Sequence, residues 1–344
     1  MRERWRAVNA VLALVFPFFG LIALGYLVAR LSPRPMEGMA WLNTFIVYVA
    51  LPALFFKLLA ETPVEDLTNW RYVGAAVAAV VVVFALVLVP SLVLSRGRTG
   101  EPTIQALAAA YGNIGYMGPG IALLALGPRA AVPVALIFTF ENIFHFTIAP
   151  LMMALRGGGG ERPGALFLGV VRRILTHPFI IATIVGIAAA VLEWRPPLAA
   201  QRMVDSLAGA AAPCALFAMG VTLALRPVNR FPPALAAIVP VKLVVHPLVC
   251  WALLMWAGPF DPVWMQAAIL LAALPTATNV YVIAQQYDVW VNRASAAVLA
   301  TTLVSVLTVT ALLYALQNGL VPLGEIDAAV GEKRGRLPLA VPGE

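Results

Sequence analysis

The hydrophobic residues of this chain are concentrated in ten runs, each about as long as a bilayer is thick. A helix needs about 20 mostly apolar residues to cross the hydrocarbon core of a membrane. Short stretches with proline, glycine and arginine separate the runs. We therefore predict an all-α membrane protein with ten transmembrane helices. The predicted helices lie at residues 8–29, 39–59, 72–94, 103–126, 130–155, 175–192, 203–225, 234–258, 263–285 and 294–316.

The longest polar break within this pattern divides the ten runs into two sets of five. This break contains four consecutive glycines, a composition typical of a flexible linker. We therefore divide the chain into a first five-helix repeat at 1–155, a cytoplasmic glycine-rich linker at 156–173, a second five-helix repeat at 174–316 and a C-terminal tail at 317–344.

Matches at one fixed spacing indicate that the two halves are related. At an offset of 161 residues, proline, glycine and glutamine recur in corresponding runs. The pairs are Pro17 with Pro178, Gly25 with Gly186, Pro52 with Pro213, and Gln105-Ala106 with Gln266-Ala267. Because each half has an odd number of helices, related halves enter the membrane from opposite sides. The pattern predicts inverted repeats, which many secondary transporters have, with the substrate site near the midplane between them.

The composition favours lipid as the solvent for this chain. Hydrophobic residues make up 62% of it and charged residues only 11%, whereas soluble proteins carry about 25% charged residues. The net charge of +7 comes mostly from arginines between the apolar runs. We interpret these arginines as loop residues that set membrane orientation, and we expect no nucleic-acid partner.

Few residues are available for metal, disulfide or ATP chemistry. Both cysteines, Cys214 and Cys250, fall within apolar runs, so a disulfide framework is not expected. The histidines His145, His177 and His246 form no zinc motif, and the chain has no P-loop. We therefore predict no metal, no cofactor and no ATP-driven step, and we do not expect an enzyme.

The arginines of the loops predict the orientation of the chain. With the N-terminus outside, the cytoplasmic loops hold Arg30, Arg34, Arg96, Arg98, Arg156, Arg162, Arg172, Arg173, Arg226, Arg230 and Arg293. The opposite loops hold Arg71, Arg129, Arg195 and Arg202. Basic residues at both ends of the chain argue the other way, but short loops carry more weight. We expect both termini to be extracytoplasmic in a multi-pass protein of the inner membrane.

Two of the predicted helices contain sequences that disfavour a continuous helix. Residues 110–120 include four glycines, Asn113 and Pro119, and residues 274–279 include Pro275. Within a helix, glycine costs about 1 kcal/mol and proline about 3 kcal/mol relative to alanine. Interrupted helices at corresponding places in two halves are the best sequence indication of a transport site. We therefore predict that the fourth and ninth helices are broken and that substrate binds at the breaks.

The same stretches resemble a known family. The segments Gly112–Gly118 (GNIGYMG), Leu274–Tyr287 (LPTATNVYVIAQQY) and Tyr48–Phe55 (YVALPALF) are similar to signature stretches of the auxin efflux carrier family. This family includes plant PIN-formed carriers and bacterial proteins, some of them described as malonate transporters. The resemblance extends to about residue 316. The chain differs from the family pattern at Gly118-Pro119-Gly120, where the family often has Gly-Leu-Pro. It also lacks the long cytoplasmic loop of many plant carriers.

The resemblance implies two inverted five-helix repeats, a crossing of the fourth and ninth helices at their breaks, a homodimer, and a carboxylate held near the crossing. By motif, Asn113 precedes the first break and Pro275 belongs to the second. Free N–H groups at the second half-helices suit a carboxylate, and asparagines add neutral donors. The predicted substrate-binding residues are Asn113, Gly115, Tyr116, Pro119, Pro275, Thr276, Thr278 and Asn279.

Three ionisable residues within the predicted helices are candidates for coupling. Glu141 and His145 lie one turn apart on the same face of the fifth helix. They could form a proton relay, or a neutral Glu141 could simply hydrogen-bond to His145 or a neighbouring helix. Lys242 could attract an anionic substrate or counter Glu141. Lys57, near the end of its helix, is interpreted as reaching the headgroups, and Asp205 as interfacial.

These observations predict a secondary transporter that moves a small mono- or dicarboxylate by alternating access, with membrane lipid around it. A cation-coupled antiporter or sodium symporter of related design is the alternative, although no paired aspartates lie at the breaks. A membrane enzyme or sensor is a more distant alternative, because neither a catalytic set nor an output domain is evident. The sequence leaves the identity of the carboxylate, the direction of transport and its driving ion open.

Overall fold

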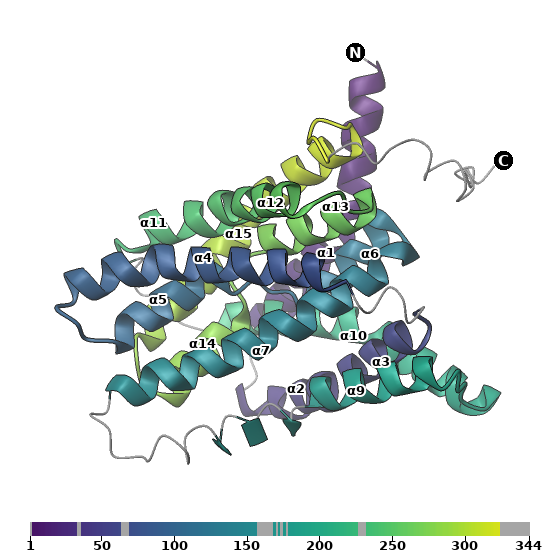
Figure 1. Ribbon diagram of the computed structural model, residues 1–344, viewed down its shortest axis with the longest axis horizontal. Coiled ribbons are helices and arrows are strands. Elements are labelled where there is room, and N and C mark those ends of the chain that lie inside the picture. Colours follow the sequence, from purple (N-terminus) through teal and green to yellow (C-terminus); the bar gives the residue numbers. More distant parts are fainter. Residues whose placement is uncertain are drawn as a thin grey trace.

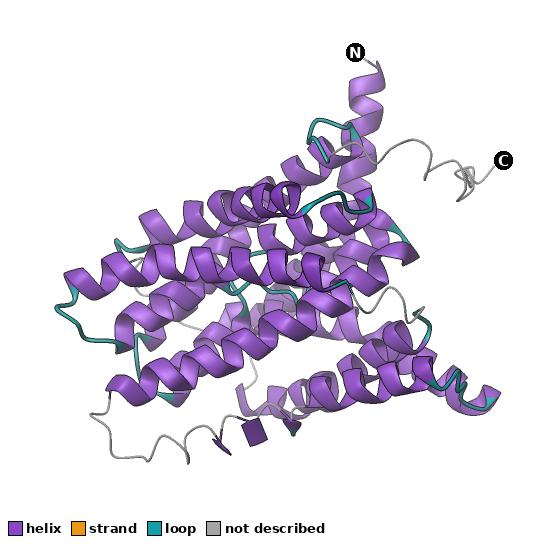
Figure 2. Cartoon of the chain, in the orientation of Figure 1, coloured by secondary structure: helices purple, strands orange, loops and turns teal. Residues whose placement is uncertain are grey.

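The computed structural model describes residues 2–32, 36–62, 69–156, 168–169, 171–172, 175–176, 178–225 and 232–323. The regular secondary structure of the described part is all helical, with loops and turns between the helices and no strand (Figure 2). Most of the predicted linker and most of the predicted tail lie outside the described residues. The two-repeat division of the chain therefore stays a prediction at this point.

The helices of the N-terminal half follow the predicted apolar runs. They are α1 (Arg2–Leu31), η1 (Met36–Met39), α2 (Ala40–Phe45), η2 (Ile46–Ala50), α3 (Leu51–Ala60), α4 (Trp70–Leu94), α5 (Gly100–Ala110), α6 (Gly118–Leu126), η4 (Pro128–Ala130) and α7 (Ala131–Arg156). The segment η2 is a π-helical turn that continues α2 into α3.

The helices of the C-terminal half also coincide with apolar runs. They are α9 (Pro178–Val191), α10 (Leu198–Leu225), α11 (Leu235–Pro240), η5 (Val241–Val245), α12 (His246–Ala257), α13 (Pro262–Ala273), α14 (Thr278–Gln286) and α15 (Val291–Gln317). The segment η5 is a second π-helical turn, between α11 and α12. Such turns occur frequently at functional sites.

Length and composition identify membrane spans among the described helices. Six are long and apolar enough to cross a bilayer, and three more are shorter apolar helices. The six are Ala40–Ala60, Trp70–Leu94, Pro128–Leu155, Leu198–Leu225, Leu235–Ala257 and Val291–Gln317, and the shorter ones are Phe16–Leu31, Ile180–Val191 and Pro262–Ala273. Their outward-facing leucines, valines and tryptophans are exposed in large numbers. The protein is therefore a multi-pass membrane protein.

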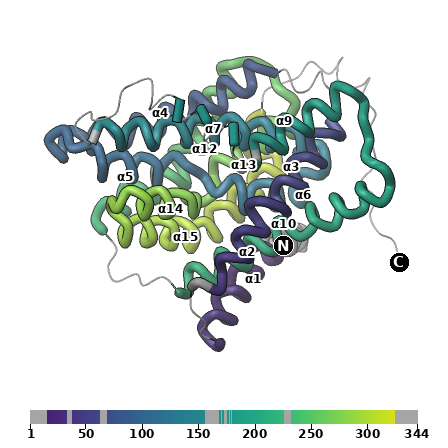
Figure 3. Tube along the Cα trace, turned by 90° about the horizontal axis from the view of Figure 1, so that it is seen from below, coloured from purple at the N-terminus to yellow at the C-terminus, as the bar shows by residue number. Residues whose placement is uncertain are grey.

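The helices pack into two groups. The first helix group consists of α1, the segment from η1 to α3, α9 and α10, which contact one another closely. The second helix group consists of α4 to α7 and α11 to α15. In Figure 1, α3 and α9 lie together along the lower edge, apart from α4 and α12. In the view of Figure 3, α5, α14 and α15 lie side by side within the second group.

Glycines bring helices of the first group into backbone contact. A Cβ atom added at Gly220 of α10 would lie 1.9 Å from the Ile22 carbonyl oxygen, and one at Gly25 of α1 would lie 2.2 Å from the Phe217 carbonyl oxygen. At Gly186 of α9 the corresponding distance to the Phe56 carbonyl oxygen of α3 is 3.2 Å. Small residues at such contacts let membrane helices approach closely, because van der Waals packing rather than the hydrophobic effect holds them together.

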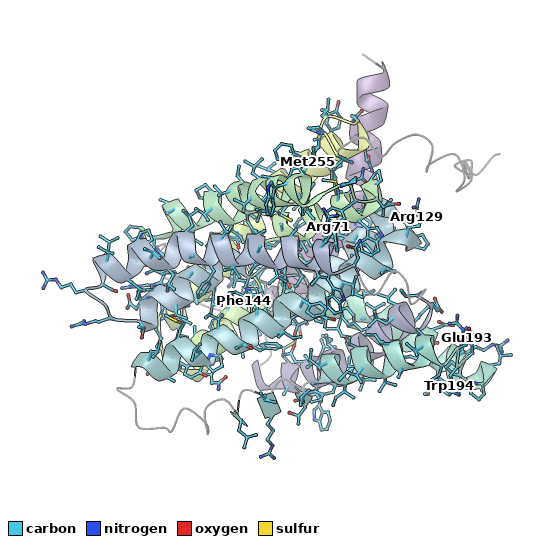
Figure 4. The ribbon with its side chains drawn as sticks, in the orientation of Figure 1. Arg71, Arg129, Phe144, Glu193, Trp194 and Met255 are labelled. Atoms are coloured by element: carbon cyan, nitrogen blue, oxygen red, sulfur yellow. The ribbon has the colours of Figure 1, made fainter. Side chains whose placement is uncertain are left out.

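Polar side chains fix several helix ends. Asn69 accepts a hydrogen bond from the Tyr72 amide at the start of α4, and Asp261 accepts one from the Val263 amide at the start of α13. These are N-caps, which satisfy donors that the first turn leaves free. Arg71 donates to the Ala257 carbonyl at the end of α12. Figure 4 shows Arg129, Glu193 and Trp194 toward one end of the molecule, with Phe144 near its middle on α7.

Candidate functional site

Both helix breaks predicted from the sequence are present. α5 ends at Ala110 and α6 begins at Gly118, while α13 ends at Ala273 and α14 begins at Thr278. Leu274 is extended, with φ −63° and ψ 151°, because a residue before proline is disfavoured in the helical region. Pro119 lies in the first turn of α6, where its missing N–H costs no hydrogen bond.

The two breaks pair with each other in an isolated antiparallel bridge between Gly112 and Thr276. The Asn113 amide donates to the Pro275 carbonyl at 2.8 Å, and the Ala277 amide donates to the Tyr111 carbonyl at 2.9 Å. Each break thus supplies hydrogen-bond partners for backbone groups of the other break that have no partner within their own helix. Irregular backbone at membrane depth persists only where protein or water satisfies it.

Side chains satisfy further carbonyl groups around the breaks. Thr276 donates its hydroxyl to the Ala108 carbonyl at 2.6 Å, and its amide donates to the Thr301 hydroxyl at 3.1 Å. The Lys242 ammonium donates to the Ala272 carbonyl at 2.6 Å, near the end of α13. Thr276 therefore holds the crossing to α5 and α15, and Lys242 places a cation at the negative end of a half-helix.

A cavity of about 440 Å³ adjoins the crossing, within the roughly 300–1,000 Å³ range of ligand pockets. It extends along α7 and α14 toward their C-terminal ends, and η2 and α3 of the first helix group form part of its wall. We call it the central cavity. Its lining residues used below are Leu51, Tyr111, Asn113, Gly115, Tyr116, Phe138, Asn142, His145, Asn279, Gln286 and Tyr287.

The central cavity includes half of the predicted binding residues. Asn113, Gly115, Tyr116 and Asn279 line it. Pro119, Pro275, Thr276 and Thr278 are not among its lining residues: Pro275 and Thr276 maintain the crossing, and Pro119 and Thr278 belong to the first turns of α6 and α14.

Asn113 is fully enclosed, with 1% of its surface exposed. Its amide nitrogen donates to the Met219 sulfur at 3.2 Å, and its oxygen has no hydrogen-bond partner among the described residues. A thioether is a weak acceptor. A half-turn of the amide group would therefore exchange donor and acceptor at little cost, and would present the NH₂ group to a ligand.

A chain of three side chains joins the two breaks to α7. Asn279 donates to the Tyr111 hydroxyl at 2.9 Å, and that hydroxyl donates to the Asn142 carbonyl oxygen. Asn142 in turn donates to the Phe138 carbonyl at 2.7 Å. Tyr111 and Asn142 were not among the residues predicted from the sequence. A neutral amide in the middle of a membrane helix was the available signal for Asn142, next to Glu141.

The three predicted coupling residues lie close to the crossing. Glu141, with 4% of its surface exposed, and the fully buried Lys242 interact electrostatically across the second helix group. His145 donates from Nδ1 to the Glu141 backbone carbonyl at 2.7 Å rather than to its carboxyl group. Lys242 lies directly behind the break, since a Cβ atom at Gly112 would be 3.4 Å from its Nζ. It also contacts His246 Nδ1 at 2.9 Å.

A second cavity, of about 660 Å³, lies at the opposite end of the same boundary between the helix groups. Lys57, Leu58, Arg129 and Asp261 are among its lining residues. Arg129 forms an ion pair with Asp261 at 2.6 Å, and Lys57 forms one with Asp205 at 2.5 Å. The interpretation of Lys57 as reaching free headgroups therefore changes: in the structure it pairs with an acidic residue of α10.

Two stacked phenylalanines lie between the cavities. Phe55 of α3 and Phe138 of α7 have ring centroids 4.2 Å apart and an interplanar angle of 22°. Along α3, Phe55 falls between Leu51, which lines the central cavity, and Leu58, which lines the second one. The ring of Phe138 lies against Gly115, where an added Cβ atom would be 3.0 Å away. The pair closes the boundary between the two helix groups at this level.

Broken helices that pair beside a cavity are the arrangement in which many membrane transporters hold their substrates, and comparison with known proteins gives the same class. The model of the membrane transport protein family matches residues 10–313, so the chain belongs to this auxin efflux carrier-like family. The resemblance inferred from the sequence motifs is confirmed.

Known relatives cover most of the chain. A Rhizobium meliloti (strain 1021) protein named "Putative malonate transporter" is 60% identical over 312 residues, covering 91% of this chain and 98% of that protein. An "Uncharacterized transporter" of Methanothermobacter thermautotrophicus is 23% identical, covering 84% and 92%. A mouse "Lysosomal cholesterol signaling protein" is 23% identical over 83% of this chain and 35% of its own length.

Proposed function

We propose that this protein is a secondary transporter that moves a small organic anion, a mono- or dicarboxylate, across the membrane by alternating access. The observation that carries the proposal is the pairing of two broken helices beside a cavity lined by Asn113, Asn142 and Asn279. The name of the R. meliloti relative favours a malonate-like dicarboxylate.

The crossing supplies the groups that a carboxylate needs. The first amides of α14, including that of Asn279, have no partner within the helix and carry the positive end of its dipole. Asn113 can present its NH₂ group after a half-turn, and Lys242 lies behind Gly112. An anion at the break would thus find neutral donors in contact and one cation nearby.

Helix packing supports the inverted repeat. Gly25 and Gly186, which match at the offset of 161 residues, each occupy a close helix contact: Gly25 joins α1 to α10, and Gly186 joins α9 to α3. In both cases the first helix of one half packs on the second helix of the other half. Such reciprocal packing is expected if ten helices form two related halves, in which α5–α6 and α13–α14 are the two broken helices.

The boundary between the helix groups supports alternating access. The three ion pairs among the described residues, Lys57–Asp205, Arg129–Asp261 and Arg293–Glu101, each lie within one group. Across the boundary, the described polar contacts are the weak Asn113–Met219 bond and a Thr139–Thr183 hydroxyl contact at 3.4 Å. Groups joined mainly by apolar packing can slide or rotate as units.

The remaining features of the proposal concern placement and assembly. With the loop arginines on the cytoplasmic side, the central cavity extends toward the cytoplasm and both termini are extracytoplasmic. We place the protein in the inner membrane, surrounded by lipid. A homodimer is proposed from the family resemblance.

The geometry disfavours the alternative of a cation site at the break. Open carbonyls at the ends of half-helices are where a transported cation would be coordinated. The Ala272 carbonyl is already occupied by the Lys242 ammonium. In the part of the chain that the structure describes, histidine, cysteine and acidic side chains form no group of three that could hold a metal ion.

Binding of a carboxylate is tested by thermal shift of the detergent-purified protein against a panel of small carboxylates, repeated with Asn113→Ala and Asn279→Ala. A ligand that binds only the folded state raises the melting temperature by mass action. We expect a shift with one carboxylate class that is lost in both variants. Melting-temperature shifts that are the same in both variants as in the wild-type protein, or no shift with any carboxylate, would point to a cation transporter or to a site elsewhere.

Glu141 is proposed to couple transport to protons. It is buried and interacts electrostatically with Lys242, and the other titratable side chains near it are the buried Tyr72, Tyr111 and Cys250. With a monocarboxylate substrate, whose own charge is constant near neutral pH, we expect Glu141→Gln to remove the pH dependence of uptake into proteoliposomes while leaving substrate binding within a factor of about 2–3. Uptake that keeps its pH dependence in this variant would rule out the coupling role.

A further inference from the structure

His145 has an unused hydrogen-bonding atom at the central cavity. The residue has no exposed surface, it lines the cavity, and its Nε2 has no hydrogen-bond partner among the described residues. The ring is held by stacking on Tyr111, with centroids 3.8 Å apart and an interplanar angle of 9°. Buried polar atoms are rarely left unpaired, so an orphaned nitrogen beside a cavity indicates a ligand group.

The other ring nitrogen determines which kind of group is missing. Nδ1 contacts the Glu141 carbonyl oxygen at 2.7 Å, and a carbonyl oxygen can only accept, so Nδ1 carries a proton. A second proton on Nε2 would be a buried donor with no acceptor, a costly arrangement. Nε2 is therefore an acceptor, and its missing partner is a donor.

The titratable side chains around the ring, with Tyr116 and Tyr287 of the cavity wall among them, do not provide that donor, because Nε2 has no hydrogen-bond partner among the described residues. Glu141 lies on the same helix, and Tyr111 contacts the ring by its face and donates its hydroxyl to Asn142. From the neighbouring helix, Lys242 and His246 interact with His145 electrostatically. Lys242 instead directs its ammonium to Ala272 and His246. The donor is therefore a water molecule or a group of the ligand, and a ligand that displaces water from this part of the cavity has to supply it.

The charge of the cavity leads to the same conclusion. Among the described residues, no lysine or arginine lines it, and Lys242 stands behind the crossing, where it already faces Glu141. One carboxylate can be held by the amides of the breaks. A second carboxylate would be a buried charge without a counter-ion, which is strongly disfavoured.

We propose that the site takes a short dicarboxylic acid as its monoanion: the carboxylate binds at the breaks, and the undissociated carboxylic acid group donates its O–H to His145 Nε2. This inference rests on the proposed function and specifies the ionic form of its substrate. His145 is then the residue that distinguishes a hydrogen dicarboxylate from a dianion. The bound molecule carries one proton and one net charge.

Three probes test the donor requirement by calorimetry on the purified wild-type protein. Malonate has the donor only while it keeps its second proton, malonamate has an amide donor at every pH, and monomethyl malonate has none. We expect malonate affinity to fall about tenfold per pH unit once the dianion dominates, because only the competent fraction binds. Malonamate should bind with an affinity independent of pH. The methyl ester should bind at least tenfold more weakly, because it leaves Nε2 unpaired.

A matched pair of variants assigns the effect to His145. His145→Phe keeps a ring to stack on Tyr111 but has no acceptor, and should bind malonamate and the methyl ester with affinities within about threefold of each other. His145→Gln restores an acceptor oxygen and should keep a preference for malonamate. Melting temperatures without ligand show whether each variant is folded. If His145→Phe does not fold, the wild-type preference for malonamate over the ester decides the question.

The outcomes separate this inference from the function on which it rests. Binding of all three probes with equal affinity, independent of pH, would overturn the inference and leave a carboxylate transporter. A donor preference that survives in folded His145→Phe would overturn the assignment to His145. Failure of all three probes to bind would overturn the proposed function and this inference together.

Discussion

Replacing Gly220 by leucine is expected to separate α1 from α10 and to abolish folding of the protein. A Cβ atom at Gly220 would lie 1.9 Å from the Ile22 carbonyl oxygen and 2.9 Å from the Tyr26 amide nitrogen. These are backbone atoms of a helix, which cannot move aside as a flexible side chain can. Membrane helices are held together by close packing, so the loss of this contact is not compensated by burial elsewhere.

Gly209, the other glycine of α10, is the matched control. A Cβ atom at Gly209 would meet nothing within 4 Å, so Gly209→Ala should be neutral or stabilising, since alanine favours a helix by about 1 kcal/mol over glycine. Gly220→Ala should lower the melting temperature of the purified protein, and Gly220→Leu should give no monodisperse protein by size-exclusion chromatography. A Gly220→Leu protein that is folded and melts like Gly209→Ala would contradict the packing described here.

Replacing Lys242 by methionine is expected to destabilise the protein by about 1–3 kcal/mol, the cost of leaving a buried acceptor without its donor. The substitution leaves Glu141 without its counter-charge and the Ala272 carbonyl without its donor. Since Lys242 also lies behind Gly112, carboxylate binding at the break should weaken in the same variant. Melting temperature and thermal shift with malonate measure the two effects separately.

The double variant Lys242→Met, Glu141→Gln is the control for this prediction. Removing both charges leaves no unpaired carboxylate, so the double variant should be more stable than Lys242→Met alone. The Ala272 carbonyl lacks its donor in both variants, so the double variant should still be less stable than the wild-type protein. If the double variant is less stable than Lys242→Met, the two groups do not act as a pair.

The positions of the helix breaks could be predicted from local chemistry alone. Pro275 and the glycines between Gly112 and Gly120 disfavour helix wherever they occur, so the interruptions follow without knowledge of the packing. The pairing of Gly112 with Thr276, in contrast, depends on how two distant segments meet. The family resemblance implied the crossing, but composition and spacing alone did not.

The side chains of the candidate site were only partly predictable. Asn113 and Asn279 stand out as amides within broken helices, and both line the central cavity. Tyr111 resembles any other aromatic residue in a membrane helix, and its role becomes evident only from its bonds to Asn142 and Asn279. Thr276 was predicted to contact substrate, yet its hydroxyl and amide are both used by the protein.

The ion pair between Lys57 and Asp205 could not be predicted from the sequence either. Lys57 and Asp205 are far apart in the sequence, and each by itself has the sequence context of an interfacial residue. Their ion pair arises because α3 and α10 pack together within the first helix group. Apolar patterns define which residues enter the membrane, but they do not specify the rotation of one helix against another.

The stacked pair of Phe55 and Phe138 has a consequence for the electrical tightness of the membrane. The pair lies in the boundary between the two cavities, so its rings would form part of the apolar barrier between water that enters the two cavities from opposite sides. Moving one elementary charge through 100 mV releases about 2.3 kcal/mol, so most of the membrane voltage would fall across this short stretch. The strongest field in the protein would then lie beside Gly115 and the proposed anion site.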